Sequence, residues 1–474
     1  MAINFKQKMN YKKLTILLLS IITISGYAQK LQILKSNTYS IKIRDGNSIS
    51  KDIWWADPKT KLDVYETGYN GKDKWITFIS DIDSIRFKVE KDKQFRFVIL
   101  INGKDSAFTQ INCVEDIPVV NFDNQYIKEH DGKTFVEIPE VYELVNIIFA
   151  LTNTGKNYKG LVYQKTDYFK EVLKWFDTFS QESIVLKMDS IINKDMFNYI
   201  AIKMDAYAFE FSKQKIVQSS IYNTISGGKI NNTKPYIQEL QSFSDKSHFH
   251  EFYKNHLSFY ASQINTFKDS IGVQEMQNWL TKNFPKSKYN SVKIIFSPLV
   301  GWNQSTNWFE SNGFKELQPH VNFPYRNEVD LKEFSSKALN IKDGNIVFTE
   351  INHGFINPEV SQPQYQKSIQ IAFSKLDTWN EKGKPAEQGY NEAYACFNEY
   401  MNWALISLRY IDYAPAKEQE KLIKDLEKKM VEGRGFKKFA EFDQYLIQIY
   451  KNREKGQTVA DLYSKIVQWF VDNK

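Results

Sequence analysis

Several patterns that carry chemistry are missing from this sequence of 474 residues. The chain has only two cysteines, Cys113 and Cys396, and neither belongs to a C-x-x-C pair or to a Cys/His zinc-finger spacing. It also lacks a P-loop, a G-x-G-x-x-G fingerprint and a nucleophile elbow. The sequence therefore does not favour a dithiol redox enzyme, a P-loop or dinucleotide-binding enzyme, or an α/β-hydrolase.

A strong excess of one charge is missing as well. Hydrophobic residues make up 42% of the chain and charged residues 25%, which is ordinary for a globular protein. A chain of this length suggests roughly two or three domains and is ample for a large core. The formal net charge is only +7, so the composition does not indicate a nucleic-acid partner.

The N-terminal residues resemble a secretory signal peptide. Lysines precede the apolar run LTILLLSIITI, and SGYAQ follows it, with Gly26 and Ala28 at the −3 and −1 positions of a cleavage site. We predict a signal peptide over residues 1–28 and an exported mature protein, periplasmic or extracellular, that begins at Gln29. Cleavage removes four lysines and no acidic residue, which lowers the net charge from +7 to +3.

Alternatives remain open at this end of the chain. An uncleaved apolar run would be a membrane anchor, but residues 14–24 are too few to span a bilayer comfortably, so no stable membrane span is expected. No cysteine follows the run, which argues against a lipid anchor. Met9 is an alternative start, because the signal is complete without residues 1–8.

The periodicity of apolar residues changes near residue 125. Residues 29–125 contain short alternating stretches such as TYSIKI, KLDVYETGY and DSIRFKVEKDKQFRFVILI, separated by turn sequences. Residues 126–474 carry apolar residues at helical spacing, as in PEVYELVNIIFALT and DYFKEVLKWFDTF. We therefore predict an α+β protein in which a small β-sandwich-like module is followed by a mainly α-helical domain.

Strands are expected to interrupt these helices before residue 329. VKIIF, residues 292–296, is β-branched and aromatic and predicts a buried strand. ELQPHVNFPY, residues 316–325, contains prolines and predicts an edge strand. Between them, Trp302 and Trp308 of GWNQSTNWF either line a cleft or close a loop.

The stretch VFTEINHGFINP, residues 347–358, resembles a zinc-protease helix with one ligand replaced. Such a helix carries H-E-x-x-H, in which two histidines bind the metal and the glutamate is the base. Glu350 and His353 have this spacing, but Thr349 stands in the first position. Asn-Pro at 357–358 predicts the end of the helix. A later helix with FNEYMNWAL carries Glu399, and gluzincins take their third zinc ligand from such a downstream helix.

Four motifs together are similar to a domain-of-unknown-function family of secreted bacterial proteins (DUF 4932) with a gluzincin-like, that is zincin-like, peptidase core. They are FSPLVG (296–301), TEINHGFINP (349–358), NEYMNWAL (398–405) and EGRGF (432–436). The family pattern is a serine-proline-leucine strand, then H-E-F-x-H-x-F-x-N-P, a Glu-bearing helix and an R-G-F turn. The resemblance covers residues 280–470 well, covers the helices from 126 loosely, and implies a peptidase-like core at about residues 280–474.

Residue by residue, the resemblance implies that Glu350 is the general base and that His353 and Glu399 are zinc ligands. Thr349 departs from the pattern at the first ligand, and Trp403 stands where the family usually has an arginine. A threonine hydroxyl is a poor zinc ligand, so zinc is expected to bind weakly or not at all. Without the metal, Glu350 has no water of lowered pKa to activate.

Other histidines offer little replacement for the missing ligand. The chain has six: His130, His248, His250, His256, His320 and His353. His320, on the predicted edge strand, is the one that could complete the site. The two histidines of HFH at 248–250 lie about 200° apart around a helix and make a poor chelate.

Three functions are compatible with these observations. The leading hypothesis is an exported, metallopeptidase-like protein with a degenerate zinc site, which binds a peptide or protein without cleaving it. The second is an active zinc metallopeptidase with an unusual ligand set. The third is an envelope structural or interaction protein that uses its β-module for attachment.

Overall fold

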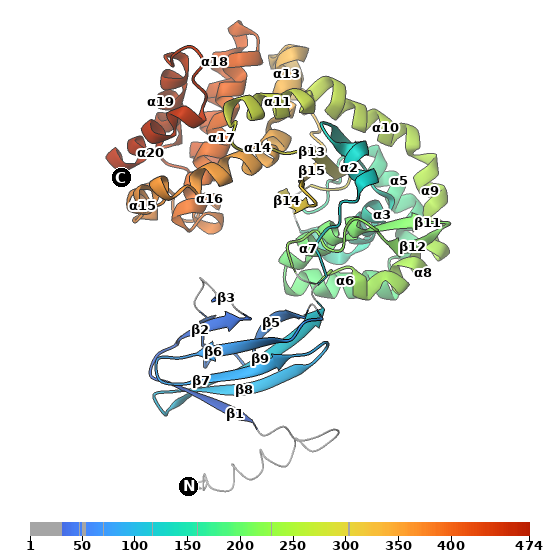
Figure 1. The fold of residues 1–474 in the computed structure, drawn as a ribbon. Coiled ribbons are helices and arrows are strands. Elements are labelled where there is room, and N and C mark those ends of the chain that lie inside the picture. Colours follow the sequence, from blue (N-terminus) through green and yellow to red (C-terminus); the bar gives the residue numbers. More distant parts are fainter. Residues whose placement is uncertain are drawn as a thin grey trace, which may run out of the picture. The chain divides into compact units, whose positions relative to one another are not determined.

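The computed structural model describes residues 31–46, 48–49, 54–69, 71–115, 117–158, 160–228, 230–301 and 304–474 (Figure 1). The chain divides into two compact units, residues 1–117 and 118–474. The first is built of strands and the second mainly of helices, as the sequence predicts. The division lies a few residues before the predicted boundary at 125.

Two sequence predictions fall on residues outside this description, namely the signal peptide at 1–28 and the position of Trp302. Within the described ranges, no helix combines the length and apolar character needed to cross a bilayer. Cys113 in the first unit and Cys396 in the second are both buried free thiols.

The first unit contains two sheets that share one hydrophobic core. One sheet has the strand order β1-β8-β9-β5 and the other β3-β2-β6-β7, with β4 paired to β2. Phe78, Phe87 and Phe97 meet between the sheets, with ring centroids 4.9 Å and 5.5 Å apart for the pairs that include Phe97. The strands are β1 Gln32–Ser36, β2 Ser40–Asp45, β3 Ser48–Ile49, β4 Trp54–Trp55, β5 Asp63–Tyr69, β6 Lys74–Ile79, β7 Ser84–Val89, β8 Gln94–Ile101 and β9 Asp105–Glu115.

Alternation explains why these residues form a two-layer module. In β7, Phe87 and Val89 are buried, whereas Ser84, Arg86 and Lys88 are exposed. One face of the strand therefore meets the core and the other meets solvent, which is the usual pattern of an antiparallel sheet.

The first half of the second unit surrounds one buried helix, α3 (Glu140–Leu151). Every residue of α3 from Val141 to Leu151 is buried, including the polar Glu143 and Asn146, as expected of a mainly apolar central helix. It packs against α4, α5, α6, α7 and α8. The elements here are α2 Asn124–His130, β10 Thr134–Glu137, α4 Asn153–Asn157, α5 Asp167–Phe176, α6 Ser183–Lys194, α7 Phe197–Asp205, β11 Phe209–Ser212, β12 Lys215–Gln218, α8 Ile237–Ser247, α9 Phe249–Asn255, α10 Leu257–Asn265 and α11 Val273–Asn283.

A four-stranded mixed sheet follows, with the order β10-β13-β15-β14. β13 (Ser291–Ser297) is buried at every residue and pairs in parallel with β10 and β15. β14 (Ser305–Ser311) is antiparallel to β15 (Phe314–Asn322) and forms one edge. The predicted strand VKIIF is confirmed, whereas β14 is a strand that the sequence analysis did not identify.

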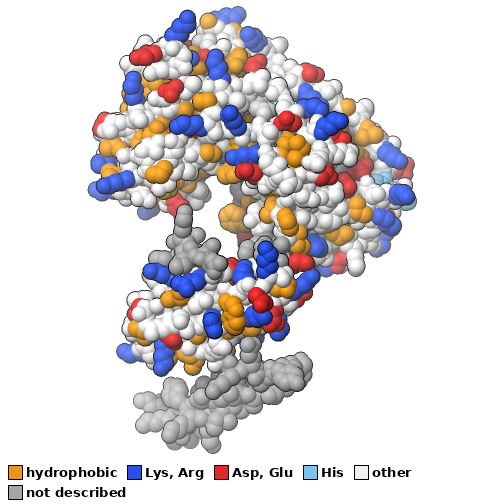
Figure 2. Space-filling model, viewed as in Figure 1, with side chains coloured by type: hydrophobic (Ala, Val, Ile, Leu, Met, Phe, Trp, Pro, Cys, Tyr) orange, Lys and Arg blue, Asp and Glu red, His pale blue; other side chains and the backbone are white. Residues whose placement is uncertain are grey.

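The C-terminal half is helical. Helix α14 (Asn345–Val360) packs on β14 and β15 from one side and on α17 (Ala393–Tyr413) from the other. The remaining elements are α12 Glu328–Glu333, α13 Ser336–Asp343, α15 Pro363–Ala372, α16 Pro385–Gly389, α18 Ala416–Lys428, the π-helical turn η6 Lys429–Arg434, α19 Phe439–Lys451 and α20 Tyr463–Asp472. On the face that Figure 2 shows, basic and acidic side chains of this unit are interspersed.

Two local predictions are wrong. ELQPHVNFPY is not at an edge, because β15 lies between β13 and β14. Pro319 is tolerated because the pairing of β15 with β13 is interrupted at this residue. Val292 pairs with Leu317 and Ile295 pairs with His320, and Pro319 has no partner on β13.

The helix with the motif also does not end at Asn-Pro. α14 continues to Val360, with Pro358 in its last turns. A proline leaves the carbonyl four residues earlier without its helical donor. That carbonyl belongs to Gly354, and it accepts a hydrogen bond of 2.7 Å from the Tyr289 hydroxyl instead.

Candidate functional site

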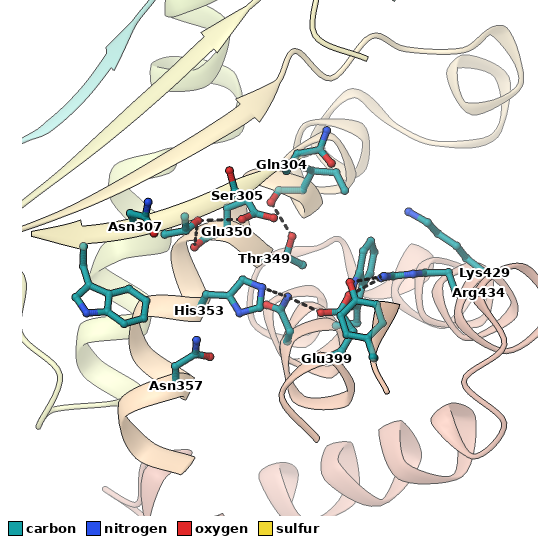
Figure 3. Close-up of a pocket in the computed structure, with 16 residues that line it drawn as sticks. Gln304, Ser305, Asn307, Thr349, Glu350, His353, Asn357, Glu399, Lys429 and Arg434 are labelled. Carbon is teal, nitrogen blue, oxygen red and sulfur yellow. Dashed lines mark hydrogen bonds and ion pairs between the residues drawn. The ribbon is translucent and has the colours of Figure 1, made fainter. Parts of the chain in front are cut away.

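One open pocket of about 610 Å³ in the second unit contains all four residues of the predicted site, Thr349, Glu350, His353 and Glu399 (Figure 3). Three elements and a turn form its walls. The start of β14 provides one side, α14 and α17 provide the floor and opposite side, and η6 closes one end. The geometry therefore brings together residues that are far apart in the sequence.

A glycine allows α14 to approach the sheet closely. A β-carbon on Gly354 would lie 2.7 Å from Leu317 Cδ1 and 2.9 Å from the Tyr289 hydroxyl. A larger residue would have to displace the Leu317 and Tyr289 side chains or push α14 away from β15. Because Gly354 follows His353 directly, this close packing also sets the height of the histidine above the sheet.

Glu350 lies on the β14 side of the pocket and is nearly buried. Its carboxylate accepts a 2.9 Å hydrogen bond from Thr306 Oγ1. Burial raises the pKa of Glu350, against the opposing influence of His353, the Thr306 hydrogen bond and Lys203. Burial in turn lowers the pKa of Lys203 to about 7, which the negative charge of Glu350 partly offsets. Glu350 is therefore a weaker acid than an exposed glutamate.

His353 points toward α17, where Asn402 meets it. Asn402 Nδ2 lies 2.9 Å from His353 Nε2 and 3.5 Å from Glu399 Oε2. The two groups that Asn402 contacts are thus no more than about 6.4 Å apart, the sum of these distances. In this arrangement the Asn402 amide donates to the lone pair of Nε2, the same lone pair that a metal ion would use.

Glu399 is held by a cation of the protein. Arg434 Nη1 forms a 2.7 Å ion pair with Glu399 Oε1, and Trp403 Nε1 donates to the same oxygen at 2.8 Å. Burial acts to raise the pKa of Glu399, but the positive charge of Arg434, followed by His353 and hydrogen bonds from Tyr390 and Trp403, lowers it overall. Glu399 is therefore kept ionised inside the pocket.

The π-helical turn η6 carries two cations into the pocket. The Arg434 guanidinium lies 4.9 Å from the centroid of the Trp403 ring, and Lys429 Nζ lies 4.3 Å from it. The tryptophan thus lies between α17 and two positive charges, at a distance suited to cation–π attraction. Trp403 stands where the resemblance predicts an arginine, and Arg434 supplies a positive charge at this place from a different segment.

Thr349 faces the pocket but is engaged with its own helix. Its hydroxyl donates to the carbonyl of Ile346 at 2.7 Å. The position lies one turn before His353 on the same face of α14, as the spacing predicts.

The donor set does not fit a zinc ion in this arrangement. Structural and catalytic zinc sites use at least three strong donors with free lone pairs. His353 Nε2 accepts from Asn402, and Glu399 is paired with Arg434 and bonded to Trp403. Across the part of the chain that the structure describes, no three His, Cys, Asp or Glu side chains are grouped so that they could hold a metal.

His320 does not complete the site. It is fully buried on the inner strand β15, with Nε2 3.1 Å from Gln318 Oε1 and its ring against Tyr142. Burial, with the nearby Lys203, lowers its pKa well below the ordinary value. The prediction that His320 lies on an edge strand is therefore wrong, and His320 does not line the pocket.

Asn402, Lys429 and Arg434 are among the pocket residues to which the sequence analysis gave no role. Arg434 lies in EGRGF, which the resemblance singled out without a role. Asn402 follows Glu399 by three residues, one turn along α17, and this spacing could have indicated a shared face. Lys429 has no such signal, because a π-helical turn is not evident from sequence.

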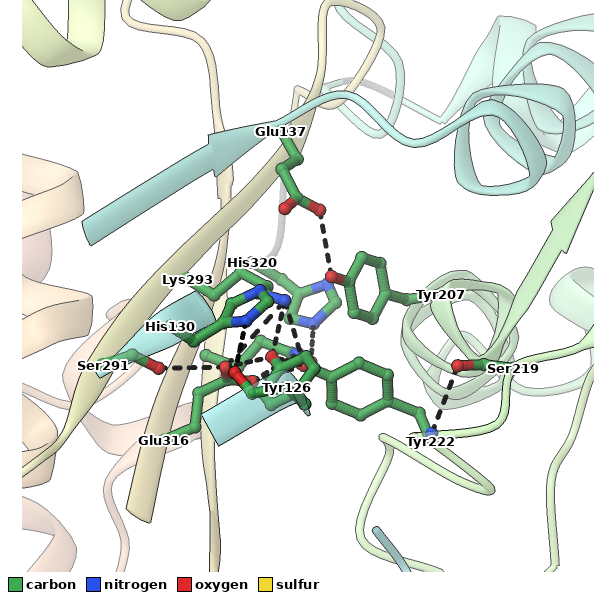
Figure 4. Close-up of polar contacts among 11 residues, drawn as sticks. Tyr126, His130, Glu137, Tyr207, Ser219, Tyr222, Ser291, Lys293, Glu316 and His320 are labelled. Carbon is green, nitrogen blue, oxygen red and sulfur yellow. Dashed lines mark hydrogen bonds and ion pairs between the residues drawn. The ribbon is translucent and has the colours of Figure 1, made fainter. Parts of the chain in front are cut away.

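A second polar cluster lies inside the same unit, away from the pocket (Figure 4). Lys293 and Glu316 are almost wholly buried, with Nζ and Oε2 3.9 Å apart. Glu316 accepts hydrogen bonds from Tyr126, Tyr222 and Ser291 at 2.5–3.0 Å. Lys293 Nζ donates to the two tyrosine hydroxyls at 2.7 and 3.1 Å. These contacts connect α2 and the loop that contains Tyr222 to strands β13 and β15.

Comparisons with family models, with curated proteins and with solved structures find no match to this chain. They therefore neither support nor contradict the resemblance drawn from the four motifs.

Proposed function

We propose that this chain is an exported, zincin-like protein related to metallopeptidases that binds an extended polypeptide in the pocket beside β14 and does not cleave it through zinc. One observation carries the proposal: the Arg434 guanidinium occupies Glu399, while Asn402 occupies His353 Nε2. The groups that would hold a metal in the related peptidases are thus already used within the protein.

The shape of the pocket supports a polypeptide ligand. β14 pairs with β15 alone among the described strands, so one side of its backbone remains open to another extended chain. Trp308 on β14 lines the pocket and is 42% exposed, which offers an apolar surface to a side chain.

The floor of the pocket supports the same ligand class. Asn357 Oδ1 and Asn402 Oδ1 are buried and accept no hydrogen bond from the described residues. Buried acceptors of this kind cost free energy until a donor reaches them. Both side chains line the pocket, so a peptide N–H group would pair with these oxygens once the amides turn toward the ligand.

The active-peptidase alternative also has an observation in its favour. Thr349, Glu350, His353 and Glu399 line one pocket, and a metallopeptidase site would also need these positions close together. Under this alternative, zinc would displace Asn402 and Arg434 from the two ligands and would find its third donor elsewhere.

Two measurements on the purified mature chain separate these functions. After dialysis against equimolar zinc, metal analysis should find far less than one zinc per chain. A pool of internally quenched peptides should bind but remain uncut, with or without a chelator. One tightly held zinc per chain, together with chelator-sensitive cleavage, would establish the peptidase instead. If no peptide binds, the proposed peptide-binding function is wrong.

A further inference from the structure

Lys429 stands out among the charged residues of the pocket because it forms no ion pair with an acidic group of the described residues. The residue is exposed, yet its ammonium lies against the face of Trp403 in the pocket. Desolvation there, together with the positive charges of Arg434 and Lys342, lowers its pKa to about 8. Within the described part of the chain, none of the influences on this ammonium comes from a carboxylate.

The other charges of the pocket already have counterparts. Arg434 is paired with Glu399 at 2.7 Å, and Glu350 is opposed by the buried charge of Lys203. On the outer side of Lys429, Asp425 and Glu432 line a shallow depression. Both are engaged: Asp425 lies 3.8 Å from Lys421, and Glu432 lies 4.0 Å from Lys428. Lys429 is therefore the cation of the pocket that has no ion pair with a described residue, and an anionic group of a ligand would supply one.

The position of Lys429 within the pocket indicates which part of a ligand would meet its charge. In Figure 3, Lys429 and Arg434 lie at one end of the pocket, and Asn307 and Asn357 lie at the other. An extended peptide along β14 would reach Lys429 with one end or with a side chain near that end. The ammonium can donate up to three hydrogen bonds, and a carboxylate accepts them strongly.

We propose that the pocket recognises its polypeptide by a carboxylate group, which Lys429 binds at the η6 end while the chain extends along β14. This inference rests on the proposed function, because it assumes a peptide beside β14. The carboxylate comes either from the C-terminus of the ligand or from an aspartate or glutamate side chain close to that end.

The test compares three pools of N-acetylated hexapeptides in equilibrium dialysis, with each bound peptide quantified by mass spectrometry. One pool ends in a free carboxylate and contains no acidic side chain. The second ends in a carboxamide and contains one aspartate. The third ends in a carboxamide and has no acidic group. Bound fractions at least about tenfold higher in the first or second pool than in the third are expected, and the preferred pool identifies the source of the carboxylate.

A matched pair of variants assigns the effect to Lys429. Lys429→Gln should remove the preference for the acidic pool, and Lys429→Arg should retain most of it. Lys428→Gln changes the neighbouring lysine, which is exposed, belongs to a loose pair with Glu432 and does not line the pocket. That control should keep the preference of the unchanged protein.

The outcomes distinguish this inference from the function beneath it. Equal binding of all three pools would overturn the carboxylate proposal and leave peptide binding intact. A preference that survives Lys429→Gln in a protein with an unchanged circular dichroism spectrum would also overturn it. If no pool binds at all, both the inference and the proposed function are wrong.

Discussion

The second unit contains two buried carboxylate–cation pairs, and they differ in how completely their partners are satisfied. Glu316 and Lys293 share the hydroxyl groups of Tyr126 and Tyr222, Ser291 donates to Glu316 as well, and the chain closes over the pair. Glu399 and Arg434 lie in an open pocket that also contains an acceptor with no donor among the described residues, Asn357 Oδ1. A closed network of this kind holds structural elements together, whereas an open one with unused polar atoms is suited to a ligand.

The largest effect on stability is expected when one member of the closed Lys293–Glu316 pair is removed. Lys293→Met should leave Glu316 uncompensated in the core and lower the free energy of unfolding by about 3–5 kcal/mol. The double variant Lys293→Met/Glu316→Leu should cost clearly less than the sum of the two single changes, because no lone charge remains. Urea unfolding curves measure both effects. Strict additivity would mean that the two groups do not interact.

Gly354→Ala tests the packing that positions the pocket. The added methyl would lie 2.7 Å from Leu317 Cδ1, so we expect a loss of about 1–3 kcal/mol in the free energy of unfolding. The loss should come without any change at the Lys293–Glu316 pair. The matched control is Gly389→Ala, because a β-carbon there would meet no atom within 4 Å. Equal losses at both positions would contradict close packing as the cause.

Part of the fold and of the pocket could be predicted from the sequence. Alternation of side chains was enough for the β-module, and the spacing of apolar residues was enough for most helices. The spacing T-E-x-x-H placed Thr349, Glu350 and His353 on one helix face. What the sequence could not provide depends on distant contacts: β14 has a polar, weakly patterned sequence, and its strand character comes from pairing with β15.

The same limit applies to the cations of the pocket. Arg434 reaches Glu399 only because η6 widens the helical turn between α18 and α19, and this pairing joins residues 35 positions apart. The prolines of residues 316–325 led to the wrong prediction of an edge strand. The rule that places strand prolines at sheet edges does not account for a pairing that is interrupted at Pro319.

Removal of Arg434 should change how the free energy of unfolding depends on pH. The pKa of Glu399 is lowered in the folded protein, so this group contributes stability at pH values above its unfolded pKa and loses it as the pH falls. In Arg434→Gln, burial should dominate and raise the pKa, so stability should fall as the pH rises through about 4–6. We expect a cost at pH 7 of about 1–3 kcal/mol, less than for Lys293→Met because the pocket admits water. Urea unfolding at pH 4, 5.5 and 7 measures the slope, and an unchanged slope would contradict this role of Arg434.

Thr349→His is the finest test, because it asks whether the open pocket retains the geometry of a metal site. The new imidazole would lie one turn before His353 on the same face of α14. It would add a strong donor, but zinc would still have to displace Asn402 from His353 and Arg434 from Glu399. We therefore expect zinc affinity to rise by only about ten- to a hundredfold, or roughly 1.4–2.7 kcal/mol. Thr349→His/Arg434→Gln should bind zinc more tightly than either single variant, because Glu399 is then free of its cation. Thr349→Asn is the control, since it changes the same position without an imidazole. Isothermal titration with zinc measures all four variants. If neither histidine variant gains affinity while circular dichroism shows intact folds, the pocket does not hold these residues as a metal-site relic, and only its role as a peptide pocket remains.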